Sequence, residues 1–259
     1  MQSTISIEDH LTKLYALWLR EFKVFLRERS RLVAATFTPV LWLFVIGSGL
    51  NSTNPSTPPG VDYQQFIFPG IVTMSIIFTS VFYGSYIIWD RKFDFLKSVM
   101  VAPVSRVAVF VGKTLGGMTN SLIQAAILLA IGVIIGIPFT PLSLAGTVAV
   151  VLLMSFGLTS LGLALGSYMY SLEGFQMIVS FVAFPLFFLS GALFPLNNLP
   201  KWLSFLTAAD PAAYAVDALR NLMLGTGTYA VGFDLALLVG YIAALGAFGI
   251  FSFSRMRAV

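Results

Sequence analysis

Six long runs of apolar residues constrain this chain more than any other feature of its sequence. A helix of about 20 apolar residues crosses a bilayer core of about 30 Å, and each run is about that long or longer. Of the 259 residues, 58% are hydrophobic and 10% are charged, whereas about 25% are charged in an ordinary soluble domain. The sequence therefore predicts an all-α polytopic membrane protein. We expect residues 1–259 to form a single transmembrane domain, located in the inner or plasma membrane.

Six transmembrane helices are expected, preceded by an amphipathic segment at residues 1–31. In that segment Trp18 and Phe22 fall on one face at helical spacing, and Lys13 and Glu21 fall on the other. A helix of this kind lies in the membrane interface. The expected spans cover about residues 32–50, 66–89, 107–137, 142–170, 175–194 and 235–253.

The basic residues indicate how the spans are oriented. Thirteen of the 15 Lys and Arg residues fall within residues 1–31, within residues 89–113 or after the last span. Since basic residues collect in cytoplasmic loops, we expect both termini in the cytoplasm. We therefore attribute the net charge of +4 to topology and predict no nucleic-acid partner. Lys113, near the start of the third span, is expected to extend its ammonium group to the interface.

Residues 90–106 form a charged loop between two spans, on the predicted cytoplasmic side. The nine residues from Trp89 carry five of the chain's 26 charged side chains. Phe95 and Leu96 continue the loop as an amphipathic helical turn, and Pro103 is expected to end it. A short, charged, helical loop clamped between two spans can receive a push from a soluble partner and pass it into the bilayer.

The sequence predicts no catalytic, nucleotide or metal site. Gly112-Lys113-Thr114 resembles the end of a phosphate-binding loop, but Val107 stands where that motif requires glycine. The chain has no cysteine, and His10 is its only histidine. Gly112 and Gly116 are spaced to let two helices approach closely. We therefore expect a transport subunit that is not itself an enzyme.

Asn120 and Gln124 stand four residues apart and share one face of the third span. They either hydrogen-bond to a neighbouring helix or line a substrate pathway, and we favour helix packing.

The segment at residues 195–230 contains start signals for short helices. Pro200 precedes one such helix, and Asp210 followed by Pro211 is typical of the start of another. Asp217 and Arg220 stand three residues apart and can pair. The apolar content predicts re-entrant helices in the outer leaflet, which could gate the outer end of a pathway. The candidate gate residues are Phe194, Pro195, Pro200, Trp202, Asp210, Pro211, Tyr214, Asp217 and Arg220.

With these residues in view, the chain resembles the permease subunit of type-2 ABC exporters of the drug-resistance and nodulation-type group. One motif carrying the resemblance is Trp-Asp-Arg-Lys-Phe-Asp-Phe-Leu-Lys from Trp89, continued by Val-Ala-Pro-Val-Ser-Arg up to Arg106. The other is Leu-Ser-Gly-Ala-Leu-Phe-Pro-Leu from Leu189, followed by Asp-Pro-x-x-Tyr-x-Val-Asp-Ala-Leu-Arg ending at Arg220. The resemblance covers essentially the whole chain.

The resemblance implies that residues 90–106 are a coupling helix that docks in a cleft of a separate ATP-binding subunit. Its docking surface would be Asp90, Arg91, Phe95, Leu96, Pro103 and Arg106. It also implies two permease copies with two ATP-binding subunits, and ATP and magnesium bound by those subunits, not by this chain. The family often has Glu where Lys92 stands and Gly where Asp94 stands.

The function expected on this basis is ATP-driven export of an amphipathic or hydrophobic substrate, drug-like or lipid-like, by a homodimer of this chain. One alternative is export of a polysaccharide or a lipid-linked glycan, which the 24 Phe and 9 Tyr leave open. An alternative of another class is an ATP-independent channel or a secondary carrier. The scarcity of charge within the spans argues against proton coupling.

Overall fold

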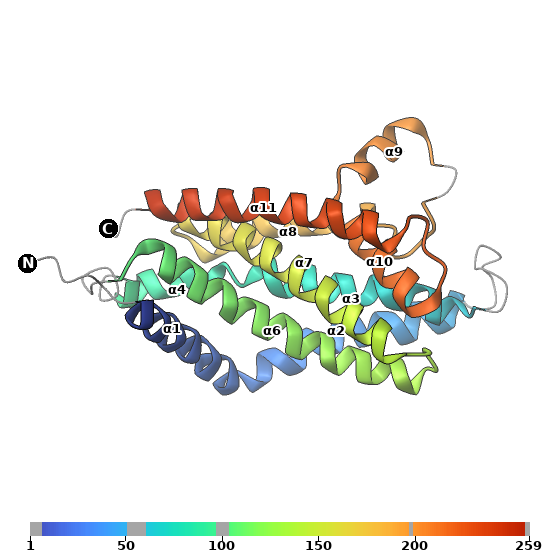
Figure 1. Cartoon of the computed structure of the whole chain (residues 1–259), viewed down its shortest axis with the longest axis horizontal. Coiled ribbons are helices and arrows are strands. Elements are labelled where there is room, and N and C mark those ends of the chain that lie inside the picture. The colour runs from blue at the N-terminus through green and yellow to red at the C-terminus, as the bar shows by residue number, and fades with distance from the viewer. Residues whose placement is uncertain (1–6, 51–60, 97–103, 197–198, 257–259) are drawn as a thin grey trace, which may run out of the picture.

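The structure, a computed structural model, describes residues 7–50, 61–96, 104–196 and 199–256 of the chain, with side chains from residue 12. Within these ranges the regular structure is entirely helical (Figure 1). The helices are α1 (Ile7–Arg27), α2 (Arg29–Leu50), α3 (Tyr63–Phe82), α4 (Ser85–Lys92), α6 (Arg106–Ile134), α7 (Pro141–Tyr168), α8 (Leu172–Leu189), α9 (Lys201–Ala208), α10 (Pro211–Leu224) and α11 (Val231–Arg255). The predicted all-α fold is confirmed.

Six helices are long and apolar enough to cross a membrane, as predicted. They are α2, the combined α3 and α4, α6, α7, α8 and α11. The amphipathic segment is shorter than expected, because α1 ends at Arg27 and the first span already begins at Arg29. Hydrogen bonds that Ser105 and Thr140 accept from backbone N–H groups cap the starts of α6 and α7.

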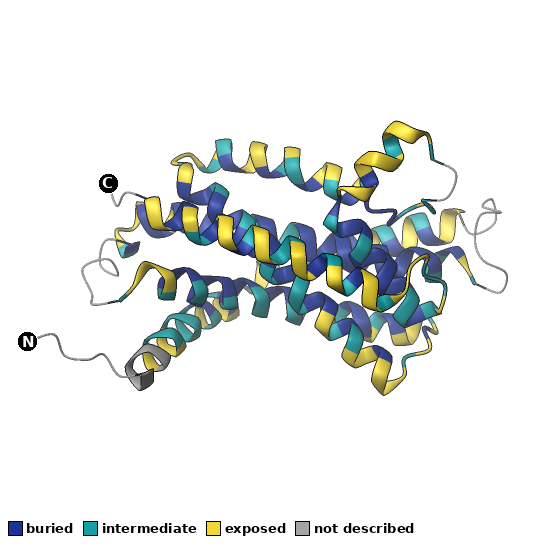
Figure 2. Ribbon diagram, turned by 45° about the horizontal axis from the view of Figure 1, so that its top comes forward, coloured by how far each residue is buried: buried dark blue, intermediate teal, exposed yellow. Residues whose placement is uncertain are grey.

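The second span is the centre of the bundle. In its apolar window 83% of the residues are buried, against 17% in α2 and 22% in α8. It packs on α2, α6, α7, α8 and α10, and buried positions accordingly run through the interior of the bundle in Figure 2. The outer helices α2, α8 and α11 leave large apolar side chains exposed, as expected of surfaces that lipid or another membrane protein covers.

Glycine residues allow α7 to cross the second span at very short range. A Cβ atom on Gly162 would lie 2.2 Å from the Val81 carbonyl oxygen, and one on Gly84 would lie 1.9 Å from the Gly162 carbonyl oxygen. The helix is interrupted here, since α3 ends at Phe82 and α4 begins at Ser85. The predicted span at residues 66–89 did not include this break.

The two ends of the bundle carry different elements. Figure 1 shows α1, α4 and the C-terminal end of α11 at one end, and α9 and α10 at the other. The described part of the charged loop therefore lies at the same end as the end of α11, which Arg106 contacts, and it also contacts Arg20 of α1. The short helix α9 stands away from the bundle, with Trp202 and Phe205 exposed.

Helix α1 packs along α6 on the two glycines that the sequence indicated. A Cβ atom on Gly112 would lie 2.8 Å from Leu17 Cβ, and one on Gly116 would lie 2.6 Å from Glu21 Cβ. These two positions bring the α1 backbone close to α6, and with it the side chain of Glu21.

Replacing Gly162 by alanine should destabilise the protein, because the new methyl group collides with rigid backbone. We expect a loss of about 1–3 kcal/mol, measured as a lower midpoint of thermal unfolding in detergent. Gly240→Ala in α11 is the matched control, since a Cβ atom there meets nothing within 4 Å. Equal unfolding midpoints for the two variants would contradict the close crossing.

Candidate functional site

Three buried charged side chains and one half-buried arginine meet where α1, α4 and α6 come together. The Lys113 ammonium group lies 3.0 Å from Glu21 Oε1 and also contacts Asp90. Arg20 donates to Glu21 at 2.6 Å and to Asp90 at 2.7 Å. Tyr83 donates to the second oxygen of Glu21 at 2.6 Å. We call Arg20, Glu21, Asp90 and Lys113 the charge cluster, and its two positive and two negative groups cancel.

The positions of Lys113 and Glu21 differ from those predicted. Lys113 is only 1% exposed and does not extend to the interface, and Glu21 is 5% exposed although it was assigned to the polar face of α1. A buried charge without a partner is very costly, so each of these groups requires the other. The reason for the error is that helical periodicity locates a polar side chain but cannot show a partner on another helix.

The electrostatic environment of Glu21 favours its ionised form. Burial raises the pKa of this carboxyl group, but the charge of Lys113, the hydrogen bond from Tyr83 and the charge of Arg20 lower it by more. The net pKa lies below the ordinary value for glutamate. Glu21 therefore stays ionised at neutral pH, and its ion pair with Lys113 holds α1 against α6.

Two arginines of the loop reach the ends of two further spans. Arg91 donates to the carbonyl oxygens of Ser167 and Met169, at 3.0 and 2.7 Å, where α7 ends. Arg106 donates to the carbonyl oxygens of Ser254 and Met256, where α11 ends. These carbonyl groups lack partners within their own helices, so a guanidinium group is a suitable cap. The loop is thus connected to α1, α6, α7 and α11.

Several of the predicted docking residues consequently point into the protein. Asp90, Arg91 and Leu96 are buried. Phe95 is half-buried, and the Arg20 guanidinium carbon lies 3.5 Å from the centroid of the Phe95 ring. Arg106 is exposed. Pro103 lies outside the described residues, as does the rest of 97–103.

The outward surface of the loop consists of residues that sequence reasoning did not select. Phe93 is 71% exposed and stacks on Trp89 with ring centroids 5.7 Å apart. The Lys92 ammonium group lies 5.3 Å from the Trp89 ring. Asp94 has φ +55°, a left-handed conformation that favours glycine. The family that the chain resembles often has glycine at this position, and that glycine was the one sequence feature that could have predicted this turn.

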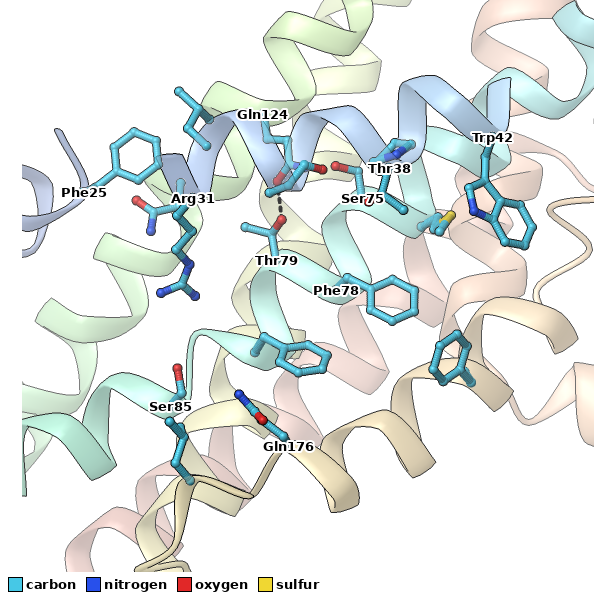
Figure 3. A pocket seen from close by; sticks show the side chains of 18 of the residues that line it. Phe25, Arg31, Thr38, Trp42, Ser75, Phe78, Thr79, Ser85, Gln124 and Gln176 are labelled. Atoms are coloured by element: carbon cyan, nitrogen blue, oxygen red, sulfur yellow. Dashed lines mark hydrogen bonds between the residues drawn. The ribbon is translucent and has the colours of Figure 1, made fainter. Parts of the chain in front are cut away.

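A cavity of about 600 Å³ opens beside the second span, between α2, α6 and α8 (Figure 3). Gln124 borders it and holds three helices together, because its amide accepts a hydrogen bond from Thr79 and donates to the Ala35 carbonyl oxygen at 2.6 Å. Asn120 also lines the cavity, but has no hydrogen-bond partner among the described residues. Of the two predicted residues, Gln124 packs helices and Asn120 faces the cavity.

The external segment begins its helices where predicted. Asp210 caps α10 through a hydrogen bond of 2.8 Å from Ala212 N, Pro211 is the first residue of that helix, and Pro200 precedes α9. Tyr214 donates to the Ala208 carbonyl oxygen at 2.8 Å and so ties α10 to the end of α9.

The pair that the spacing of Asp217 and Arg220 allows does not form in the described structure. Asp217 accepts hydrogen bonds from the backbone of Thr228 and Tyr229. Arg220 donates to the Gly191 carbonyl oxygen at 3.0 Å. Burial lowers the pKa of Arg220 to about 10, although Asp217 opposes this shift.

The remaining predicted gate residues do not gather at one point. Trp202 lies on the exposed face of α9, away from the bundle, and Phe194 is exposed. Pro195 is half-buried. Neighbouring Gly191 and Leu193 accept hydrogen bonds from Arg220 and Tyr63, so the segment after α8 is fastened to α10 and to the start of α3.

Six apolar crossings, an N-terminal helix packed along the third span and a charged loop fixed at one end define a multi-pass membrane protein. The chain belongs to the ABC-2 type transporter family, whose sequence profile matches residues 12–224.

Individual relatives agree with this family. The ycf38 protein of Cyanophora paradoxa, described as a transport permease, is 28% identical over 224 residues, covering 85% of this chain and 77% of that protein. The inner membrane transport permease YadH of Escherichia coli K12 is 26% identical over 233 residues, covering 89% and 90%. Nodulation protein J of Rhizobium meliloti is 26% identical over 231 residues, covering 87% of each.

Replacing Lys113 by methionine should destabilise the protein strongly, because two buried carboxylates then share one cation. We expect a loss of about 3–5 kcal/mol, seen as a lower midpoint of thermal unfolding in detergent. Adding Glu21→Gln should restore part of this loss. Lys92→Met is the matched control on the exposed side of the loop and should change stability by less than about 1 kcal/mol. Equal effects at Lys113 and Lys92 would contradict the charge cluster.

The stability of the external segment should depend on pH through Asp210. Burial raises the pKa of this carboxyl group to about 7, although the hydrogen bond from Ala212 N opposes the shift. A raised pKa means that the stabilisation is complete below about pH 4 and is lost as the pH rises through about 7. The slope for one proton reaches at most about 1.4 kcal/mol per pH unit.

The thermal unfolding midpoint should therefore be higher at pH 5.5 than at pH 8.5, and Asp210→Asn, which retains a cap acceptor, should flatten this difference. Unchanged pH dependence in Asp210→Asn would show that other groups cause it.

Proposed function

We propose that this chain is the permease subunit of an ATP-driven exporter, and that the loop between its second and third spans receives the stroke of a separate ATP-binding subunit. Family membership supports the transport role, since permeases of this family ordinarily act with such a subunit. We further propose that the loop faces the cytoplasm, that two copies of the chain form the membrane part, and that the partner subunits bind ATP and magnesium.

The observation that carries this proposal is the way the loop is held. On its inward side, the charge cluster connects the loop to α1 and α6, and Arg91 and Arg106 connect it to α7 and α11. Its outward side presents Phe93 on a turn that the rest of the loop holds in place. A rigidly held aromatic side chain is suited to fill a pocket on a partner, and force applied there acts on α1, α6, α7 and α11.

The proposed substrate is amphipathic or hydrophobic, because the lining of the cavity beside the second span is mostly aromatic and aliphatic and lies within the expected bilayer. Export of a polysaccharide or lipid-linked glycan is the second candidate, and the relative named Nodulation protein J leaves it open. The external helices α9 and α10 would then form the outer end of the pathway.

The test is co-expression with the ATP-binding subunit, followed by co-purification and measurement of ATP hydrolysis. Phe93→Ala should lower assembly or turnover about tenfold or more, as expected for truncation of a central anchor. The double variant Phe95→Ala/Leu96→Ala should also lower them, by loosening the support of the turn. Trp202→Ala, an exposed aromatic residue at the opposite end, is the control. Wild-type assembly and turnover in both loop variants would refute the docking role.

A further inference from the structure

The cavity beside the second span has the size and lining of a small-molecule site. Its volume of about 600 Å³ falls in the range of pockets that hold drug-sized ligands. Along α2 the cavity extends from Arg31 to Trp42, eleven residues or about 16 Å of helix. That is roughly half of a bilayer core of about 30 Å. The cavity begins near the charged loop, so it lies in the same half of the bundle.

Aromatic rings line and close the inner part of the cavity. Phe78 packs edge-on against Phe184 with ring centroids 5.2 Å apart, and Phe82 stacks on Phe78 at 6.2 Å. Trp42 meets Phe187 edge-on at 5.8 Å, which joins α2 to α8 at the end of the cavity away from the loop. These surfaces suit an alkyl or aryl group, and the labelled rings are visible in Figure 3.

Polar groups without partners stand against this apolar lining. Within the described part of the chain, neither the buried Ser75 hydroxyl nor the amide of Asn120, a residue that is 5% exposed, has a hydrogen-bond partner. A buried amide or hydroxyl that lacks a partner costs about 1–3 kcal/mol, so both are suited to bind a polar group of a ligand. Both come from the central helices α3 and α6.

The charge of the lining restricts the ligand further. Arg31 is the only charged residue among the described residues that line the cavity. It lies at the end next to the loop, 3.5 Å from Glu28, with its guanidinium group 4.7 Å from the Tyr86 ring. The deeper cavity offers no counter-ion, and placing an unpaired charge there would be costly.

We propose that this cavity binds an uncharged amphiphile, with its hydrogen-bonding head at Asn120 and Ser75 and its apolar chain along Phe78, Phe82 and Phe184. The proposal rests on the proposed export function and names its substrate class. Entry is from the side between α2 and α8, because both helices pack on α3 but hardly on each other.

Photo-crosslinking of the full chain in lipid nanodiscs, without an ATP-binding subunit, tests the proposal. The probe is N-dodecylacetamide with a diazirine on its chain, and adducts are located by mass spectrometry. We expect adducts on α2, α3 and α8 that excess unlabelled N-dodecylacetamide removes, whereas dodecyltrimethylammonium and dodecanesulfonate compete at least tenfold more weakly. Adducts spread equally over α11, or equal competition by all three, would overturn the proposal. Selective competition by dodecanesulfonate would assign the site to an anion held by Arg31.

Variants then test the head-group contacts. Asn120→Leu should lower the adduct yield about fivefold to tenfold, the loss expected for one hydrogen bond, and Ser75→Ala should lower it less. Asn221→Leu, the same substitution outside the cavity, should leave the yield unchanged. Unaltered yields in both Asn120→Leu and Ser75→Ala would overturn the head-group assignment. Because the ATP-binding subunit is absent, failure here leaves the docking result standing, and failure of docking leaves this result standing.

Discussion

The structure depends on one buried ammonium group, that of Lys113, held between the carboxylates of Glu21 and Asp90. Each carboxylate belongs to a different part of the chain, α1 and the charged loop, and Lys113 itself belongs to the third span. The three segments can come together only if all the charges do, because any one of them buried alone would be strongly unfavourable. The glycines at 112 and 116 supply the space for this contact.

This arrangement determines what the charged loop can do. Arg91 and Arg106 cap the ends of α7 and α11, which pack on each other along the bundle and both contact α10 at the far end. A displacement of the loop therefore acts on helices that extend to the external segment. Phe93 remains exposed as the point at which a partner can act on the loop. The proposed ligand cavity begins at the same end, with Arg31 and Trp89 in its lining.

Features governed by local rules could be predicted from the sequence. Run length and composition predicted six spans, and Asp210 followed by Pro211 predicted the start of α10. The basic residues around the charged loop indicated that this end of the protein differs from the other. The resemblance to the ABC-2 family predicted a docking role for the same loop.

Features that depend on contacts between distant segments could not be predicted. The break at Gly84 arises from the approach of Gly162, and the burial of Glu21 arises from Lys113, ninety-two positions away. Asp217 and Arg220 have the spacing of an ion pair, but each bonds to backbone groups instead. Asp217 accepts from Thr228 and Tyr229, and Arg220 donates to Gly191. The inward orientation of Asp90 and Arg91 has the same origin, because a charged residue in a loop gives no sign of whether its partner is water or a helix.

The most direct test of the central claim is site-specific crosslinking at the exposed turn of the loop. The chain contains no cysteine, so Phe93→Cys and Trp202→Cys each introduce a single thiol. Membranes that also contain the ATP-binding subunit would be treated with 4-(N-maleimido)benzophenone, whose maleimide reacts with the introduced thiol, then irradiated so that the benzophenone inserts into a nearby C–H bond, and analysed for adducts. We expect Phe93→Cys to crosslink to the ATP-binding subunit and Trp202→Cys not to do so. Efficient crosslinking from position 202, or none from position 93 in a complex that still co-purifies, would contradict the assignment of the loop as the docking element.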